Sequence, residues 1–132
     1  MTPLRVLIVE DNPVIRDLFM LGIDRLETQL HMKPDSLQVF QSEEGASAWE
    51  HIVKNGADLV VVDLYLPVLN GLDLIKRIRE NKDTAGIKVL AISASIQDAR
   101  DRSLGAGANQ FLPKPLRLVD LLGAMKTLLN LS

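Results

Sequence analysis

Short continuous apolar runs alternate along the chain with longer segments in which apolar residues recur at helical spacing. The runs are rich in β-branched residues and are typical of strands buried on both faces, whereas the longer segments are typical of amphipathic helices. The predicted strands span residues 4–9, 37–40, 58–63, 88–93 and 110–112. The predicted helices span about 13–34 at the most, 43–55, 72–81, 96–104 and 116–131.

A strand followed by a helix occurs five times, and no linker, repeat or low-complexity segment interrupts this order. Such alternation predicts an α/β fold of the (βα)5 type, a doubly wound parallel sheet with helices on both faces. The length of 132 residues suits one domain with a sizeable core. We therefore expect a single domain over residues 1–132, with no output domain.

Turn-forming residues mark the ends of several predicted helices. Asn12 is expected to cap the first helix, with Pro13 at its first position. Gly56 is expected to end the second helix, and Gly105 is expected to be the C-terminal cap of the fourth.

Composition excludes several classes of protein. The formal net charge of −2 argues against direct binding to nucleic acid or to an anionic membrane surface. No apolar stretch approaches the roughly 18 residues of a membrane span, and the N-terminal residues do not resemble a signal peptide. The absence of cysteine excludes disulfides and thiolate chemistry, and it is compatible with the cytoplasmic location that we expect.

Three of the apolar runs end in residues that carry chemistry. The first ends in Glu10 and Asp11, the third ends in Asp63, and the fifth leads to Lys114. Parallel α/β sheets bind ligands beyond the carboxyl ends of their strands, where the strand order reverses. If these strands lie side by side, three carboxylates and one ammonium group meet in one shallow pocket.

The adjacent acids Glu10 and Asp11 have two interpretations. Asp11 could help Asn12 to cap the helix that follows, but two adjacent acids cannot both be helix caps. Mg²⁺ takes oxygen ligands in near-octahedral geometry, uses one or two carboxylates and often bridges to a phosphate. The pair therefore favours a Mg²⁺ site.

Asp63 is either a polar strand end or a nucleophile toward a phosphoryl group, which would form an aspartyl phosphate. Three carboxylates repel one another, and a divalent ion together with Lys114 would balance their charge. The hydroxyl of Ser93 could donate to a phosphoryl oxygen. Taken alone, Ser93 is typical of a strand end and Lys114 of a solvated loop.

Together these motifs resemble a response-regulator receiver domain, and the resemblance runs from Val6 to the final helix. The motifs that carry it are, in order, Val9-Glu10-Asp11, Asp63-Leu64-Tyr65-Leu66-Pro67 with Gly71, Ile92-Ser93-Ala94, Gly105-Ala106 and Phe111-Leu112-Pro113-Lys114-Pro115. Each motif is weak by itself, and five in register are strong.

The resemblance implies a flavodoxin-like strand order of 2-1-3-4-5 and a role for each site residue. Asp63 would be the phosphoacceptor, while Ser93 and Lys114 would hold the phosphoryl oxygens. Asp11 would bind Mg²⁺ directly and Glu10 through water, with Asp63 and the backbone carbonyl of Tyr65 as further ligands. The bond between Lys114 and Pro115 would be cis.

The resemblance also implies partners and a conformational switch. The phosphodonor would be a phosphohistidine on a sensor histidine kinase or a histidine phosphotransfer protein, and a downstream protein would be the target. The domain would catalyse only its own phosphorylation and dephosphorylation. On phosphorylation, Ser93 would move toward the phosphoryl group and Phe111 would rotate inward. This change would alter the face formed by the fourth helix, fifth strand and fifth helix.

The sequence departs from the family pattern at three positions. Glu10 stands where aspartate is commoner, and Phe111 stands where many members have tyrosine, so a hydrogen bond by that hydroxyl is missing. Tyr65 is a bulky aromatic residue two positions after Asp63, where it would control the access of water. We expect Tyr65 to slow the loss of phosphate.

Two further features have both a plain and a functional interpretation. The chain is longer than is typical around Glu27 to Pro34, which is either a tolerated surface insertion or a contact with a specific partner. The last helix is apolar over more than one stripe, which indicates a homodimer or partner docking through this helix.

Other classes of protein fit less well. A phosphatase of the haloacid-dehalogenase type needs a second aspartate where Tyr65 stands, and a nucleotide-binding enzyme needs a glycine-rich loop after the first strand. The remaining alternative is a receiver-like interaction module that works without phosphorylation.

Overall fold

The computed structural model describes residues 3–66, 68–94 and 98–131. Its five strands form one parallel sheet in the order β2-β1-β3-β4-β5, which confirms the predicted fold class and strand order. The strands are β1 (Leu4–Val9), β2 (Leu37–Ser42), β3 (Leu59–Asp63), β4 (Lys88–Ser93) and β5 (Gln110–Pro113). The helices are α1 (Pro13–Gln29), α2 (Gly45–Asn55), α3 (Gly71–Glu80), α4 (Ala99–Ala106) and α5 (Leu118–Leu128).

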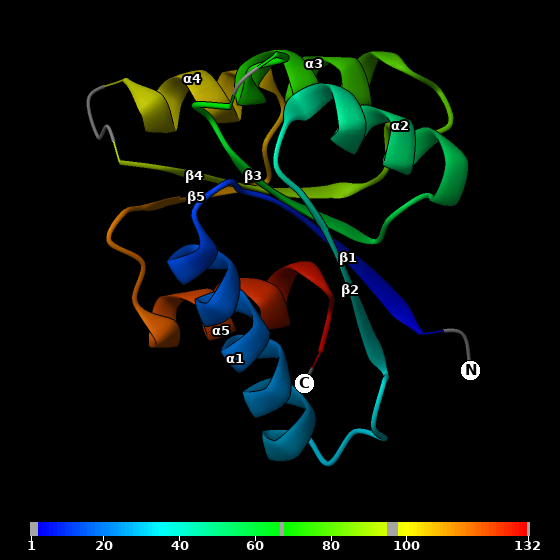
Figure 1. The fold of residues 1–132 in the computed structure, drawn as a ribbon, viewed down its shortest axis with the longest axis vertical. Coiled ribbons are helices and arrows are strands. Elements are labelled where there is room, and N and C mark those ends of the chain that lie inside the picture. Colours follow the sequence, from blue (N-terminus) through cyan, green and yellow to red (C-terminus); the bar gives the residue numbers. More distant parts are fainter. Residues whose placement is uncertain (1–2, 67, 95–97, 132) are drawn as a thin grey trace.

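The helices form two layers around the sheet. Figure 1 shows α1 and α5 on one face and α2, α3 and α4 on the other. Each face has its own apolar cluster, so the central strands are covered on both sides. This explains why the strand from Leu59 to Val62 is apolar at every position, since all four residues are fully buried. In the described ranges, no helix is long and apolar enough to cross a lipid bilayer.

The caps predicted for two helix ends are confirmed. The side chain of Asn12 accepts a hydrogen bond of 2.9 Å from the backbone N–H of Val14, and Pro13 is the first residue of α1. At the end of α2, Gly56 has a φ of 70°, a conformation in which a side chain would be strained.

The predicted cap of the fourth helix is wrong. Gly105 lies inside α4, and the helix ends at Ala106 with Gly107 as its C-terminal cap. The backbone of Gly107 has a φ of 121°, which favours glycine, and Gly105 is not among the positive-φ glycines. The predicted start of this helix at Ile96 lies outside the described residues.

Other boundaries differ by a few residues. The second strand continues to Ser42 because Ser42 pairs with Val9, and α2 begins correspondingly later, at Gly45. The last helix is shorter than predicted at both ends, from Leu118 to Leu128, and Asn130 beyond it has a φ of 56°. The first helix ends at Gln29, well before the limit set by Pro34.

The unusual apolarity of α5 follows from two packing partners. Leu121 and Met125 are fully buried in the cluster on the α1 side of the sheet. A Cβ atom added at Gly22 of α1 would lie 3.4 Å from Leu121 and 3.7 Å from Leu118, which shows how closely α1 and α5 approach. Val119 is the large apolar side chain of α5 that stays exposed, at 63%. Dimerisation through this helix therefore stays a prediction without an extended apolar patch to support it.

Gly71 allows the loop after β3 to fold back on itself. Gly71 is the first residue of α3, and its N–H donates a 3.0 Å hydrogen bond to the carbonyl of Leu64. A Cβ atom at this position would lie 2.3 Å from the carbonyl oxygen of Asp63 and 2.6 Å from the Cα of Leu64. Both neighbours are backbone atoms and cannot move aside without displacing Asp63.

We predict that Gly71→Ala lowers the free energy of unfolding by about 1–3 kcal/mol, the usual cost of overpacking. Urea unfolding followed by circular dichroism measures the change. Gly123→Ala is the matched control, because a Cβ atom there has no neighbour within 4 Å and Gly123 lies inside α5. The control should raise stability by up to about 1 kcal/mol through helix propensity. Equal stability of Gly71→Ala and the wild type would contradict the close backbone approach.

Candidate functional site

The predicted site residues come together at the carboxyl ends of the strands. Glu10 and Asp11 follow β1, Asp63 is the last residue of β3, and Lys114 follows β5. The strand order reverses between β1 and β3, so this is the position where a doubly wound sheet opens its crevice. One carboxylate oxygen from each of the three acids lies within 4.8 Å of the other two.

Lys114 joins the carboxylates of two strands. Its Nζ donates a 2.9 Å hydrogen bond to Asp63 Oδ2 and lies 3.1 Å from Glu10 Oε2. Burial alone would lower the pKa of Lys114, but its contacts with Asp63 and Glu10 outweigh this effect and raise the pKa. The ammonium group is therefore charged at neutral pH and compensates part of the negative charge.

Glu10 is fully buried, and its carboxylate is bound by a backbone N–H of the loop that follows β1. Its Oε1 accepts a 3.0 Å hydrogen bond from the N–H of Asn12. Burial is the largest influence on Glu10 and raises its pKa. The charge of Asp63 acts in the same direction, while Asn12 and Lys114 oppose it. The N-cap of α1 is Asn12, and among the described hydrogen bonds none joins the carboxylate of Asp11 to the first turn of the helix.

Asp63 has both carboxylate oxygens engaged. Oδ2 accepts from Lys114, and Oδ1 accepts a 3.0 Å hydrogen bond from the backbone N–H of Tyr65. The residue is 5% exposed, so its orientation is set by these two donors while one side of the group still reaches the surface. The loop after β3 thus turns back toward the acid that precedes it.

Ser93 and Phe111, the predicted switch residues, are both buried. Ser93 ends β4 with no exposed surface, and its carbonyl accepts a 2.8 Å hydrogen bond from the N–H of Lys114. Phe111 is 9% exposed and belongs to the apolar cluster on the α3 and α4 side of the sheet. Ser93 therefore lies next to the strand end that carries Lys114, as its position in the sequence predicts.

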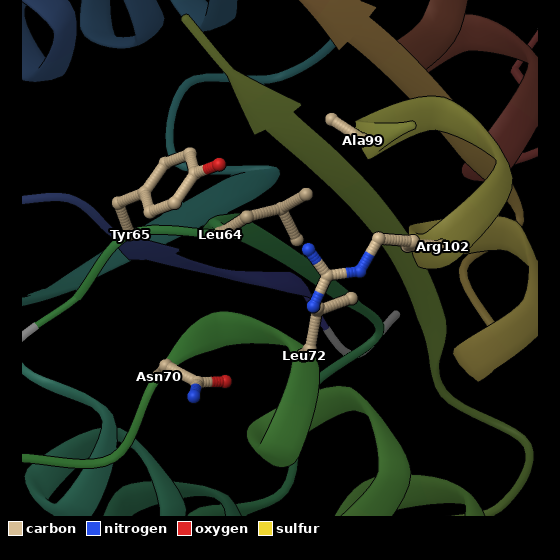
Figure 2. Close-up of a pocket in the computed structure, with 6 residues that line it drawn as sticks. All are labelled: Leu64, Tyr65, Asn70, Leu72, Ala99 and Arg102. Carbon is tan, nitrogen blue, oxygen red and sulfur yellow. The ribbon is translucent and has the colours of Figure 1, made fainter. Parts of the chain in front are cut away.

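A small hollow lies beside the acidic cluster, between the loop after β3 and α4. Figure 2 shows Arg102 reaching from α4 toward Leu64 and Leu72, with the ring of Tyr65 at the other end. The hollow measures about 100 Å³, and its lining residues include none of the three carboxylates. Sequence reasoning did not single out Arg102, because no motif signals which residues of α4 face the β3 loop.

The donor set fits a hard divalent cation. Within the described residues, Glu10 Oε2 is a buried oxygen whose one close polar contact is the ion pair with Lys114 at 3.1 Å. Three carboxylates with one ammonium group leave a net negative charge, and Mg²⁺ prefers such oxygen ligands. The part played by the backbone carbonyl of Tyr65 stays a prediction.

Comparisons with known proteins agree with this geometry. The sequence model of the family described as response regulator receiver domain matches residues 6–126. The response regulator MprA of Mycobacterium sp. (strain KMS) is 34% identical over 128 residues, which cover 97% of this chain and 51% of the relative. This chain thus spans about half the length of the curated relative that it matches.

Solved structures show the same fold. The receiver domain of the sensor histidine kinase PA1611 from Pseudomonas aeruginosa, crystallised with a magnesium ion coordinated in its active-site cleft, superposes with a TM-score of 0.81. It is 25% identical, and the match covers 98% of this chain and 99% of that one. A response regulator from Thermotoga maritima gives a TM-score of 0.78 at 25% identity, with 98% and 99% covered.

The fold and the acidic cleft define an α/β domain of the flavodoxin-like type with a cluster of three acids at the carboxyl ends of its strands. Together with the family match over residues 6–126, they show that the chain belongs to the response regulator receiver domain family of two-component signalling.

Asp11 is exposed and makes no ion pair within the described part of the chain, so without a cation it only adds repulsion to the site. We predict that Asp11→Asn raises the free energy of unfolding in the presence of a chelator by up to about 1 kcal/mol. Urea unfolding at low ionic strength measures this. Asp83→Asn, which removes an exposed acid from the loop after α3 that makes no ion pair among the described residues, should leave stability nearly unchanged. A loss of stability in Asp11→Asn would show that its carboxylate has a structural partner.

Proposed function

We propose that this domain accepts a phosphoryl group on Asp63 from a phosphohistidine of a sensor histidine kinase or a histidine phosphotransfer protein. The observation that carries the proposal is the position of the Asp63 carboxylate. It ends β3 between two hydrogen-bond donors, Lys114 and the N–H of Tyr65, and it lies beside two further acids. A carboxylate held in this way is a positioned nucleophile.

The reaction is an in-line transfer. An oxygen of Asp63 forms a bond to phosphorus while the bond between phosphorus and the imidazole nitrogen of the donor breaks. The imidazole takes the electron pair and then a proton, and Asp63 becomes an aspartyl phosphate. Lys114 and Ser93 are placed at neighbouring strand ends to stabilise the phosphoryl oxygens by an ammonium charge and a hydroxyl donor. The domain catalyses only this reaction and the hydrolysis of the aspartyl phosphate, in which water attacks phosphorus, the bond to the Asp63 oxygen breaks and inorganic phosphate is released.

Mg²⁺ is the cofactor that the cluster supports. Glu10, Asp11 and Asp63 would hold it, with the carbonyl of Tyr65 completing the protein ligands. When bound, the ion neutralises charge that develops on the phosphoryl oxygens. The magnesium ion in the active-site cleft of the related PA1611 receiver domain supports this assignment.

Phosphorylation is expected to bias two packings of the surface formed by α4, β5 and α5, where a downstream protein would dock. Ser93 would move toward the phosphoryl group, and Phe111 would respond on the neighbouring strand. In this structure Phe111 is already in the buried cluster, so its response starts from a buried position. A homodimer through α5 and a cytoplasmic location remain part of the proposal.

A receiver-like module that works without phosphate is the second candidate. No observation at the site favours this candidate. The residues expected for phosphorylation are all present at adjoining strand ends: the acidic pair, Asp63, Ser93 and Lys114. Chemistry at Asp63 separates the two candidates.

We predict that acetyl phosphate adds a single phosphoryl group to the wild type in the presence of Mg²⁺, and none to Asp63→Asn. Intact mass spectrometry measures the addition, with a chelator in a parallel sample. The reaction should need Mg²⁺ because the ion offsets the charge of three carboxylates. No addition, together with no Mg²⁺-dependent shift in thermal unfolding, would favour the phosphate-independent module.

We also predict that Tyr65→Asn loses its phosphoryl group faster than the wild type. Tyr65 is 61% exposed next to Asp63, where its ring can obstruct attacking water, and asparagine is smaller and polar. The decay of the phosphorylated mass after removal of the donor measures the rate, and Tyr65→Phe is the control that keeps the ring. We expect an increase of several-fold in the asparagine variant alone. Equal or slower loss in Tyr65→Asn would remove this role for Tyr65.

A further inference from the structure

The two edges of the sheet are protected to different degrees. The β5 edge strand has four residues, ends in Pro113 and is followed by Lys114. The β2 edge strand has six residues, Leu37-Gln38-Val39-Phe40-Gln41-Ser42, with neither a charge nor a proline. Short length, proline and lysine are the devices by which edge strands avoid pairing with other chains. The β2 edge has none of these devices.

The backbone of β2 offers hydrogen-bonding groups to a further strand. Leu4 N–H bonds to Ser36 O and Glu10 N–H bonds to Ser42 O, so the even-numbered residues face β1. The odd-numbered residues then direct their backbone groups outward. The N–H of Leu37 is taken by Glu27 Oε2 at 3.2 Å. In the described structure, the outward-facing N–H and C=O groups of Val39 and Gln41 have no hydrogen-bond partner.

A hollow borders this edge on the α1 side of the sheet. It measures about 640 Å³, and Met20 and Ile23 of α1 contribute apolar surface to it. Three carboxylates also line it, from Asp24, Glu27 and Asp35. Glu27 begins the segment from Glu27 to Pro34, interpreted above as an insertion or a partner contact, and Asp35 directly follows it. The two ends of this segment therefore lie at the hollow beside the β2 edge.

A second hollow, of about 430 Å³, borders the edge on the α2 side, and Glu43, Glu44 and His51 line it. Glu43 pairs with Arg16 at 3.1 Å. Burial, and to a lesser degree Arg5, lowers the pKa of His51, so its imidazole is neutral at pH 7. The residues that line the two hollows include no lysine or arginine, but Arg16 pairs with Glu43 on the α2 side, so the hollow beside α1 with its three carboxylates is the more acidic flank.

We propose that the β2 edge binds an extended, lysine- or arginine-containing segment of a partner protein, which adds to the sheet as a further strand. The main-chain groups of Val39 and Gln41 supply the pairing. Because side chains of a strand alternate, one set meets the hollow beside α1, where its lysine or arginine side chains face the three carboxylates, and the other set faces the hollow beside α2. The helices α1 and α2 lie on opposite faces of the sheet (Figure 1). A second copy of this chain does not fit, because two acidic edges would repel each other.

The first test uses a blocked synthetic peptide that alternates lysine and valine, titrated into isotope-labelled protein and followed by amide chemical shifts. Saturable shifts centred on Val39 and Gln41 are expected. The same peptide with glutamate in place of lysine should bind at least about tenfold more weakly, because its charges face carboxylates. Absence of saturable shifts at this edge up to millimolar peptide, or equal binding of the glutamate peptide, would overturn the proposal.

The second test separates backbone pairing from simple charge attraction. Gln41→Pro removes an outward N–H from an exposed position of an edge strand, where proline is tolerated, and Gln41→Ala keeps that N–H. Binding of the lysine–valine peptide should weaken about tenfold in the proline variant alone. Equal binding to both variants would exclude strand addition.

A charge variant keeps the proposal testable if Gln41→Pro does not fold. Asp24→Asn combined with Asp35→Asn removes two exposed carboxylates of the α1-side hollow, and the expected loss is about fivefold. Asp101→Asn on α4 is the matched control and should bind as the wild type does. Unchanged affinity in the double variant would contradict the acidic recognition.

Discussion

The ion pairs of Lys114 connect parts of the fold that do not pair in the sheet, since one strand separates β5 from β3 and two strands separate β5 from β1. Lys114 follows β5, yet its ammonium group contacts Glu10 beyond β1 and Asp63 at the end of β3. Removing one partner of such a buried pair typically costs about 3–5 kcal/mol, because the remaining charge is left uncompensated. The site therefore depends on the register of the whole central sheet. The sheet in turn tolerates three clustered acids because Lys114 offsets part of their charge.

The site and the fold could be predicted from the same signal. Continuous apolar runs identify strands that are buried on both faces, and in a parallel sheet the carboxyl ends of such strands must meet at one edge. The polar residues that directly follow these runs are therefore neighbours without any knowledge of side-chain packing. Glu10, Asp63 and Lys114 follow this rule, and the structure brings them together. Their chemical roles rest on the resemblance to the family and not on the spacing.

Properties that depend on contacts between distant elements could not be predicted in this way. The sequence predicts Gly105 as the cap of the fourth helix, but the cap is Gly107, where φ is 121° and a Cβ atom would lie 2.5 Å from Arg79. The apolarity of α5 indicates an interface if the helix packs on the sheet alone. In the structure α5 also packs against α1, where Gly22 permits a close approach. The position of Glu27 and Asp35 beside the β2 edge also depends on contacts between α1 and β2 that the sequence does not show.

The face formed by α4, β5 and α5 and the edge formed by β2 lie at opposite sides of the sheet, and each is joined to the acidic cleft by a backbone hydrogen bond. The face of α4, β5 and α5 connects through Ser93, whose carbonyl accepts from the N–H of Lys114. The β2 edge connects through Ser42, whose carbonyl accepts a 3.0 Å hydrogen bond from the N–H of Glu10. Because the cleft lies between them, a partner at one edge does not obstruct the other. A strand added at β2 would pair with the same strand whose last residue, Ser42, accepts the hydrogen bond from the N–H of Glu10.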